Sequence, residues 1–436
     1  MAQESNSDDS TAGQQAMGVE ADAVLRLGLL MVAAGTGGYR VIRAMKRAAR
    51  AMRFDRLDAE ISITSVVCTF HRGVSFRTVV ATQPAPAVDA SRIEALEHLT
   101  HHLPNRMSAN ALTMCLDDIV HSVTHRWSRP VLMVAAGAAC AAFALLNYFP
   151  AEGAAAVAVA AACGQLVRMI LASRHLNQLG VVAVAAATSC LVFYLLNWAL
   201  PLTHLPDDAR AFAAGYIAAV LYLIPGFPLF SSMLDLSRFD ITAGLTRLCY
   251  AMAVITAATM SVALVSAMTG LSPLSIDAPT PTARWYLLAA VASFVGVGGF
   301  ALLFNSSRRM VLFAASIGVV ANMVRLVMID AGVQPQYAAY TGGVVVGLLG
   351  AVITAQTTLP RITMTVPASV IMIPGTAMYR AVHFLNSGDI DQALSNAATA
   401  GLIIVWISAG LVTARILTDR DWAFGKPIDF QKHTAD

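Results

Sequence analysis

Ten apolar segments, each long enough to cross a membrane, follow one another along most of this chain. A transmembrane helix needs about 20 predominantly apolar residues, and so many such segments are hard to bury in the core of a water-soluble protein. Their approximate bounds are residues 131–149, 153–172, 179–200, 211–235, 243–268, 285–304, 309–329, 336–357, 362–384 and 392–417. The composition agrees, because 57% of the 436 residues are hydrophobic and only 13% are charged. We therefore predict a multi-pass membrane protein.

The region before the first span has a different pattern and predicts a small soluble domain. Helical periodicity in residues 19–34 and 39–52 is followed by two alternating, β-branched segments at 61–70 and 74–81, and then by two further helices. The predicted organisation is a disordered N-terminus at 1–18, a cytosolic α+β domain at 19–128, a first five-span repeat at 129–270, a second at 283–420 and a cytosolic tail at 421–436.

The two halves of the membrane region repeat each other. Phe143-Ala-Leu-Leu ends the first span and Phe300-Ala-Leu-Leu ends the sixth, and an arginine follows each phenylalanine at the same spacing (Arg168 and Arg325). Because five is an odd number of spans, consecutive copies insert with opposite orientation. The predicted fold class is a mainly α membrane protein of ten transmembrane helices, arranged as two inverted five-helix repeats and preceded by a small cytosolic α+β domain.

An Ile-Pro-Gly tripeptide, at 224–226 and again at 373–375, predicts a broken helix in each half. Proline lacks an N–H group and clashes with the preceding turn, and broken backbone is tolerated in a membrane only where it lines protein or a water-filled cavity. Half-helix N-termini suit a carboxylate, and the carbonyls before a break suit a cation. Proline kinks that serve only packing are the alternative. The substrate-binding candidates at the breaks are Pro225, Gly226, Phe227, Ser231, Pro374, Gly375, Thr376 and Tyr379.

Polar side chains elsewhere in the spans complete the candidate site, because ionisable groups are costly in a membrane and are usually functional. Four more substrate-binding candidates occupy matching positions in the two halves: Gln165, Arg168, Asn322 and Arg325. Snorkelling of the two arginines to the headgroups is the alternative.

Three aspartates on or after the half-helices are candidates for proton coupling, with helix capping as the alternative. They are Asp235, Asp240 and Asp389. Arg247 and Arg380 are the candidates for forming ion pairs with them.

Histidines in the soluble domain could in principle bind a metal. Acids and histidines recur at i, i+4 and i+8 on two helices: Glu94, His98 and His102, then Asp117, His121 and His125. An apolar stripe on the first of these helices places its histidines on the solvated side, and no metal-ligand motif is present, so we predict no metal and no cofactor. No phosphate-binding P-loop occurs in the sequence, which argues against an ATP-driven pump.

The distribution of arginines predicts the orientation. With the N-terminus inside, the cytosolic loops hold Arg174, Arg238, Arg308, Arg309 and Arg361, and the outer loops hold Arg210, Arg284 and Arg380. Cytosolic loops carry an excess of positive charge. Both termini are therefore predicted to be cytosolic.

Together these motifs resemble the threonine/serine exporter family over nearly all of residues 20–420. The residues that carry the resemblance are Ile224-Pro225-Gly226 with Asp235, Asp240, Gly244 and Arg247, then Ile373-Pro374-Gly375, Tyr379-Arg380 and Gly388-Asp389, and in the soluble domain Gly38-Tyr39-Arg40-Val41. Ile42 departs from the pattern, which has an acidic residue there. The resemblance implies a ten-span exporter of the bacterial inner membrane, driven by the proton motive force. Where related bacteria divide the two halves between separate proteins, it implies export of dicarboxylates such as succinate.

The leading functional prediction is a secondary transporter that exports threonine and serine by alternating access around two broken helices. The alternatives are an exporter of dicarboxylates, a channel, and a membrane-tethered metal-dependent hydrolase that uses the N-terminal domain. The predicted partners are a small-molecule substrate, protons and the lipid bilayer, without nucleic acid, and a homo-oligomer is left open.

Overall fold

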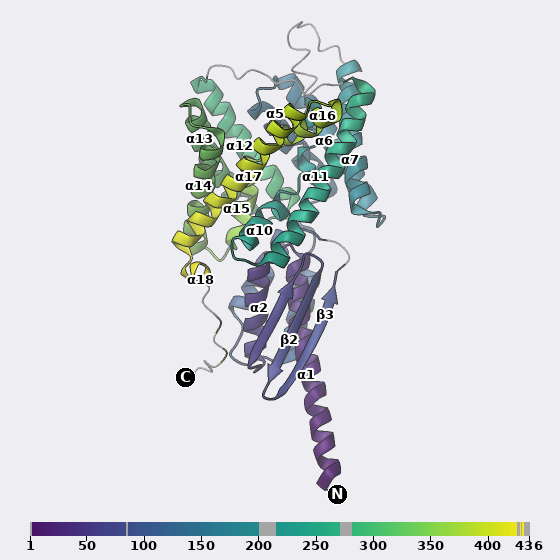
Figure 1. Cartoon of the computed structure of the whole chain (residues 1–436), viewed down its shortest axis with the longest axis vertical. Helices are drawn as coiled ribbons and strands as arrows, with labels where there is room; N and C mark the ends of the chain where they lie inside the picture. Colours follow the sequence, from purple (N-terminus) through teal and green to yellow (C-terminus); the bar gives the residue numbers. More distant parts are fainter. Residues whose placement is uncertain are drawn as a thin grey trace. The chain divides into compact units, whose positions relative to one another are not determined.

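The computed structural model describes residues 2–83, 86–199, 215–270, 281–424, 428 and 430, with side chains from residue 17 onward. The chain divides into two compact units (Figure 1). The first unit comprises residues 1–125, 231–248 and 424–436, and the second comprises residues 126–230 and 249–423. The first unit thus takes in the end of helix α10 (Gly226–Leu236) and the start of helix α11 (Ile241–Thr269) in addition to the N-terminal region.

The first unit contains a three-stranded antiparallel sheet in the order β1-β2-β3. Its strands are β1 (Arg56–Ile61), β2 (Ser65–Arg72) and β3 (Ser75–Thr82). The predicted hairpin corresponds to β2 and β3, which are joined at Gly73, where φ is +57°. Glycine adopts this angle without strain. Strand β1 was not predicted, because its outward positions are charged (Arg56, Asp58, Glu60) and only Leu57 and Ile61 are fully buried apolar residues.

Helices α1 (Ala2–Ala33) and α2 (Gly38–Ala51) pack on the sheet. The alternate residues Val66, Cys68 and Phe70 of β2 are buried in the same core as Leu27 and Met45 of these helices. Helices α3 (Ala90–His101) and α4 (Ala109–Ser122) complete the helical part. They begin at side-chain caps, since Asp89 accepts a hydrogen bond from the Arg92 N–H and Ser108 accepts one from the Ala111 N–H.

Helix α1 begins much earlier than the sequence predicted. The polar residues 1–18 were expected to be disordered, whereas the helix begins at Ala2. This segment contains no proline. No proline therefore interrupts a helix that extends back from the buried apolar part of α1.

Eight helices in the described part of the chain are long and apolar enough to cross a membrane, and two bent pairs raise the number to ten if each pair is one span. This confirms a multi-pass membrane protein. The first five spans are α5 (Arg129–Leu146), α6 (Ala151–Ala172), α7 (Gln178–Ala199), the pair formed by α9 (Gly215–Ala218) and η1 (Leu221–Leu223) with α10, and α11. The start of the fourth predicted span, residues 211–214, lies outside the described residues.

The second set of spans repeats this order of elements. It consists of α12 (Ala283–Leu303), α13 (Arg308–Asp330), α14 (Pro335–Gln356), the pair α15 (Arg361–Val370) and α16 (Gly375–Ser387), and α17 (Ile390–Thr418), which the short helix α18 (Arg420–Ala423) follows. The bent pairs are bent by 61° in the first set and 54° in the second, and the last helix of each set has 29 residues.

The first helices of the two sets, α5 and α12, pack closely through small residues. A methyl group placed on Gly296 would lie 3.2 Å from Cβ of Ala142, and one placed on Gly299 would lie 2.9 Å from Cβ of Ala139. The rings of Phe143 and Phe300 meet edge to face, with centroids 6.0 Å apart. Counted from the two Phe-Ala-Leu-Leu sequences, Ala139 corresponds to Gly296 and Ala142 to Gly299, so these contacts are reciprocal.

Candidate functional site

The two Ile-Pro-Gly tripeptides form helix breaks with the same backbone geometry. In each copy the isoleucine N–H donates to the carbonyl three residues earlier, and the glycine N–H donates to the isoleucine carbonyl. The bonds are Ile224 to Leu221 (3.1 Å) and Gly226 to Ile224 (2.8 Å) in the first copy, and Ile373 to Val370 (3.0 Å) and Gly375 to Ile373 (2.9 Å) in the second. Proline cannot donate to the carbonyl four residues earlier. The tighter bonds replace the missing one, and a new helix then begins at each glycine.

The two breaks also lie against each other. A methyl group placed on Gly226 would lie 2.7 Å from Val370 Cγ2 and 3.3 Å from Ile373 Cδ1. One placed on Gly375 would meet the corresponding side chains of the first break, Leu221 and Ile224. The two breaks are thus in direct contact, because the glycines let the two chains approach closely.

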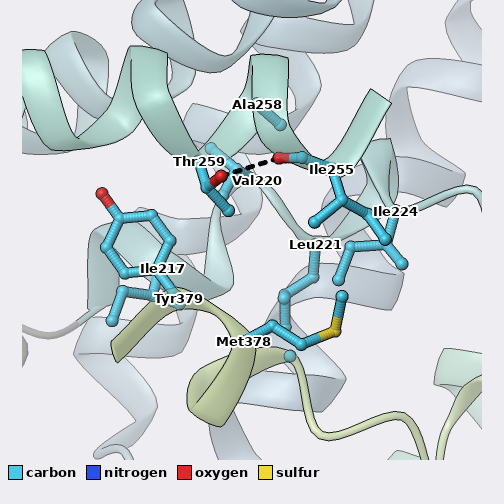
Figure 2. A pocket seen from close by; sticks show the side chains of 10 residues that line it. Ile217, Val220, Leu221, Ile224, Ile255, Ala258, Thr259, Met378 and Tyr379 are labelled. Atoms are coloured by element: carbon cyan, nitrogen blue, oxygen red, sulfur yellow. Dashed lines mark hydrogen bonds between the residues drawn. The ribbon is translucent and has the colours of Figure 1, made fainter. Parts of the chain in front are cut away.

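We call the place where the two breaks are in contact the crossing. A pocket adjoins the crossing in the second unit (Figure 2). Its wall is apolar apart from two hydroxyl groups: Ile217, Val220, Leu221, Ile224, Ile255, Ala258, Thr259, Gly375, Met378 and Tyr379 line it. Of the predicted candidates, Gly375 and Tyr379 are in this lining. The hydroxyl of Thr259 donates to the Ile255 carbonyl at 2.8 Å, as the dashed line in Figure 2 shows.

Tyr379 supplies the one polar side-chain atom of the lining that lacks a hydrogen bond within the described part of the chain. Its side chain is 2% exposed, and its hydroxyl has no partner there. Its ring meets the ring of Tyr216 edge to face at 5.7 Å. Tyr379 lies in the second turn of α16, whose first N–H groups have no acceptor within the helix. A buried hydroxyl that has no partner among the described residues and a helix N-terminus therefore lie on one short stretch of backbone.

The four matched polar candidates lie outside this lining. Asn322 is fully buried, donates to the Ser293 hydroxyl at 2.8 Å and accepts from Arg325 Nε at 2.9 Å. Its counterpart Gln165 is also buried, but its side-chain oxygen has no hydrogen-bond partner among the described residues. Arg168 is half-buried. The structure thus places these residues in the interior of the helical unit but does not bring them to the pocket.

The remaining candidates at the breaks have packing or capping contacts. Phe227 packs edge to face on Phe304, with centroids 5.7 Å apart, and Ser231 is buried. Asp389 is exposed and caps α17, because it accepts a hydrogen bond from the Gln392 N–H at 3.1 Å. Arg380 is half-buried.

Asp235, Asp240 and Arg247 belong to the first unit and lie together there. Asp235 is 4% exposed and Arg247 is 2% exposed, and their charged groups are 3.5 Å apart. The residues around them include Thr36 and Gly38 of the N-terminal region, which sequence reasoning did not connect with these charges.

The histidine-bearing helices show no metal centre: within the described residues no three histidine, cysteine or acidic side chains are arranged to hold a metal. His102 Nδ1 is 2.8 Å from the His98 carbonyl, and His121 Nδ1 is 2.7 Å from the Asp117 carbonyl. Both rings are thus engaged with the preceding turn of their own helix.

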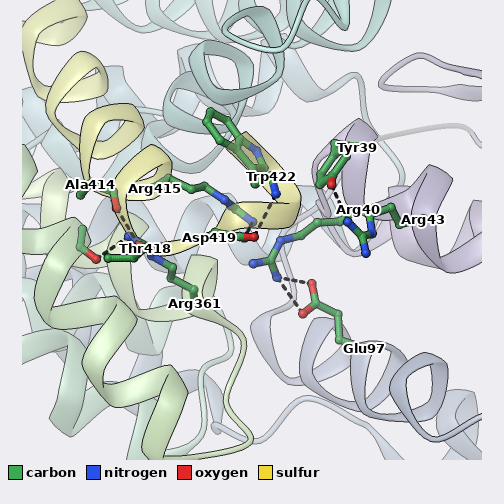
Figure 3. Close-up of polar contacts among 11 residues, drawn as sticks. Tyr39, Arg40, Arg43, Glu97, Arg361, Ala414, Arg415, Thr418, Asp419 and Trp422 are labelled. Atoms are coloured by element: carbon green, nitrogen blue, oxygen red, sulfur yellow. Dashed lines mark hydrogen bonds and ion pairs between the residues drawn. The ribbon is translucent and has the colours of Figure 1, made fainter. Parts of the chain in front are cut away.

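Arginines that were not among the candidates for the site tie helices together within each unit (Figure 3). In the second unit the buried Arg361 donates to the Gly347 carbonyl at 2.5 Å and to the Thr418 hydroxyl at 2.8 Å, which ties the start of α15 to α14 and α17. In the first unit Arg40 donates to both oxygens of Glu97, at 2.5 and 2.7 Å. These contacts stabilise the fold and leave the pocket to other residues.

Thr259 and Met378 of the pocket were missed by sequence reasoning. A single hydroxyl or thioether inside an apolar span usually belongs to packing, so neither gave a signal. A threonine in the span that follows the first break, facing a tyrosine of the second half-helix, could be found only once the helices were arranged in space.

Two comparisons with known proteins give matches. Residues 22–269 match the protein family described as "Putative threonine/serine exporter", and residues 289–417 match the one described as "Threonine/Serine exporter, ThrE". A relative from Escherichia coli (strain K12), described as "Probable succinate transporter subunit YjjP", is 24% identical over 228 residues, which cover 51% of this chain and 84% of that protein. A protein of the same description from Klebsiella aerogenes is 23% identical over 229 residues, which cover 52% and 84%. No solved structure gives a significant match.

Proposed function

Because the chain belongs to the threonine/serine exporter family, we propose that it exports threonine, serine and similar small hydrophilic amino acids across the bacterial inner membrane. The protein is a transporter and not an enzyme, as family membership shows, so the hydrolase alternative falls. In this proposal the N-terminal domain and both termini are cytosolic, the proton motive force drives export, and the substrate passes through the site by alternating access around the two broken helices.

The reciprocal contact of the two breaks is the observation that carries this proposal. In a two-fold arrangement, if residue i of one copy contacts residue j of the other, then j of the first contacts i of the second. Gly226 against Ile373 and Gly375 against Ile224 fulfil this relation, and so do the α5–α12 contacts. This supports two inverted five-span repeats with the substrate site where they meet, which is typical of secondary transporters.

The lining of the pocket offers groups that suit an amino acid, for which the pocket would have to widen, because it now has room for little more than a water molecule. We assign the substrate carboxylate to the N-terminus of α16 and the hydroxyl of Tyr379, because a helix N-terminus and a donor hydroxyl both favour an anion. The Thr259 hydroxyl and the Ile255 carbonyl to which it donates can accept from an ammonium or a substrate hydroxyl. The apolar wall suits the methyl group of threonine. A second carboxylate here would be costly, since the lining contributed by the described residues contains no cation.

Export of a dicarboxylate such as succinate is the second candidate. The description of the two curated relatives favours it. A dicarboxylate would need donors at both half-helix N-termini, with one carboxylate at α16 and the other at α10. Because the two N-termini adjoin each other at the crossing, an outward movement of the breaks in the transport cycle would open room between them.

Counterflow into proteoliposomes tests the proposal. Purified protein is reconstituted with internal threonine, serine, succinate or malate, and exchange of the labelled compound is measured without a gradient. We expect threonine and serine to exchange. We expect Tyr379→Phe to raise the substrate concentration at which exchange is half-saturated. Tyr337→Phe, which changes a half-exposed tyrosine outside the pocket, is the matched control. Exchange of succinate alone would replace the leading proposal with the second, and gradient-driven flux that an uncoupler leaves unchanged would refute proton coupling.

A further inference from the structure

The N-terminal end of helix α2 lies against the acidic end of α10 within the first unit. The backbone N–H of Gly38, the first residue of α2, donates to Asp235 Oδ2 at 3.2 Å. There is no room for a side chain at this contact, because a methyl group on Gly38 would lie 2.5 Å from Asp240 Oδ2 and 2.7 Å from Ala243 Cβ. One placed on Gly37 would lie 3.0 Å from Asp235 Oδ1. The two glycines therefore let the backbone approach two carboxylates. The Gly38 N–H and the positive end of the α2 dipole stabilise the ionised form of Asp235, which leaves Asp240 as the acid that takes up the proton.

Arg247 of α11 holds the other side of this contact. It donates to the Thr36 carbonyl at 2.6 Å and lies 3.5 Å from Asp235. Its Nε atom and the Thr36 hydroxyl are buried and have no hydrogen-bond partner within the described residues. Arg247 thus joins the Thr36–Gly38 segment to the half-helix acid, and the cluster retains unused polar capacity.

The charges around Asp240 come from four parts of the unit. They are Asp235 on α10, Arg238 in the following connection, Arg247 on α11 and Glu60 on β1. Glu60 accepts from the Thr242 hydroxyl at 2.7 Å, and Arg238 lies over the Tyr39 ring at 4.1 Å. Three carboxylates therefore face two guanidinium groups. When all three acids are ionised the cluster has one excess negative charge, and a single bound proton neutralises it.

We propose that Asp235, Asp240 and Arg247 form a proton-binding site that the Thr36–Gly38 segment completes, so that proton binding and attachment of the N-terminal domain to α10 favour each other. Asp235 lies at the end of α10 opposite Gly226, where the helix break begins. The link to transport rests on the proposed function, whereas the proton site itself does not.

The direction of the coupling follows from linkage. Burial, and after it the Asp235 carboxylate, raise the pKa of Asp240 from its ordinary value of 3.8 to about 6, with Arg247 and Arg238 acting in the opposite direction. An acid whose pKa is raised in the attached state binds its proton more tightly there, so protonation strengthens attachment and ionisation weakens it. The difference between these two pKa values makes attachment at most about 100-fold more favourable with Asp240 protonated than with Asp240 ionised.

Hydrogen exchange of the full chain in lipid nanodiscs tests the site, with the Gly38 amide as the reporter. After correction for intrinsic exchange, we expect protection of this amide to increase by about 10-fold as the pH falls from 7.5 to 5, because with pKa values of about 6 in the attached state and 3.8 otherwise the rest of the effect develops below pH 5. Asp240→Asn should remove this pH dependence and leave protection high. Asp389→Asn, at the matching but exposed position of the second half, should leave it unchanged. Constant protection in the unmodified protein, or pH dependence that persists in Asp240→Asn, would overturn the proposal.

A second variant separates structural damage from the proposed role. Gly38→Ala should lower protection of residues 36–38 at every pH through its clash with Asp240, while protection in the β2–β3 hairpin stays unchanged. If Gly38→Ala leaves residues 36–38 as protected as before, the contact is wrong. If an uncoupler leaves transport flux unchanged while the hydrogen-exchange results are as expected, the proton-driven exporter is refuted and the proton-binding site is retained.

Discussion

Replacement of Gly226 by alanine tests whether the close contact of the two breaks determines the stability and the transport activity of the protein. The added methyl carbon would lie 2.7 Å from Val370 Cγ2, whereas ordinary contact begins at 3.4 Å. The neighbouring side chain must therefore move by about 0.7 Å, the difference between these distances. Overpacking of this kind costs about 1–3 kcal/mol. The better helix propensity of alanine offsets at most about 1 kcal/mol, and less at the first residue of a helix.

We expect Gly226→Ala to lower the free energy of unfolding by about 1–2 kcal/mol, from these two opposing terms. Unfolding in detergent–SDS mixtures measures stability, and counterflow measures transport. Gly401→Ala is the matched control, because this glycine is exposed on α17 and a methyl group there meets nothing within 4 Å. This control should be neutral or stabilising and should transport normally.

A double variant identifies the cause of the loss. In Gly226→Ala/Val370→Ala the clashing carbons are removed, so the two substitutions should couple favourably by about 0.5–3 kcal/mol, as neighbouring residues do. Two results would refute the reasoning: Gly226→Ala with unchanged stability and counterflow, or a double variant whose loss equals the sum of the single losses.

Three further outcomes are expected. Tyr379→Phe should raise the half-saturation concentration about 10- to 100-fold, which corresponds to the loss of a hydrogen bond to a charged group. Unfolding stability should stay the same or rise, because the variant removes a buried hydroxyl that has no partner among the described residues. A lower stability with an unchanged half-saturation concentration would make Tyr379 a packing residue. Asn322→Leu should cost about 1–3 kcal/mol in SDS unfolding, because Ser293 and Arg325 lose their partner. Gln165→Leu, at the matching position, should be neutral or stabilising because the oxygen of Gln165 has no partner in the described part of the chain. Equal losses in the two variants would contradict this difference.

The parts of the structure that were predicted depend on local sequence. At Pro225 and Pro374 a missing backbone donor is followed directly by a glycine, so these breaks could be located by inspection, whereas Pro367, which no glycine follows, stays within α15. The β2–β3 hairpin could be predicted because its residues alternate and Gly73 permits the turn. Strand β1 was missed because its outward charges hide the alternation of Leu57 and Ile61.

The parts that were not predicted depend on contacts between distant residues. Nothing in the sequence around Ile224 says that Gly375 lies beside it, and the same is true of Gly38 and Asp235. The pairing of Asp235 with Arg247 was a candidate because both follow the same break within a short stretch of chain. Thr259 could not be separated from the other isolated hydroxyls of the spans until its distance from α16 was known.

The hydrogen bonds inside each break have a consequence for how the chain is made. The side chains that pack on Gly226 belong to the second half and are synthesised only after the first five spans. Until then the first break has no partner, in a lipid environment where every backbone polar group must be satisfied internally. The bonds from Ile224 to Leu221 and from Gly226 to Ile224 are contained within the tripeptide and the turn before it. The first half can therefore keep its bend after it has inserted and before the second half has been synthesised.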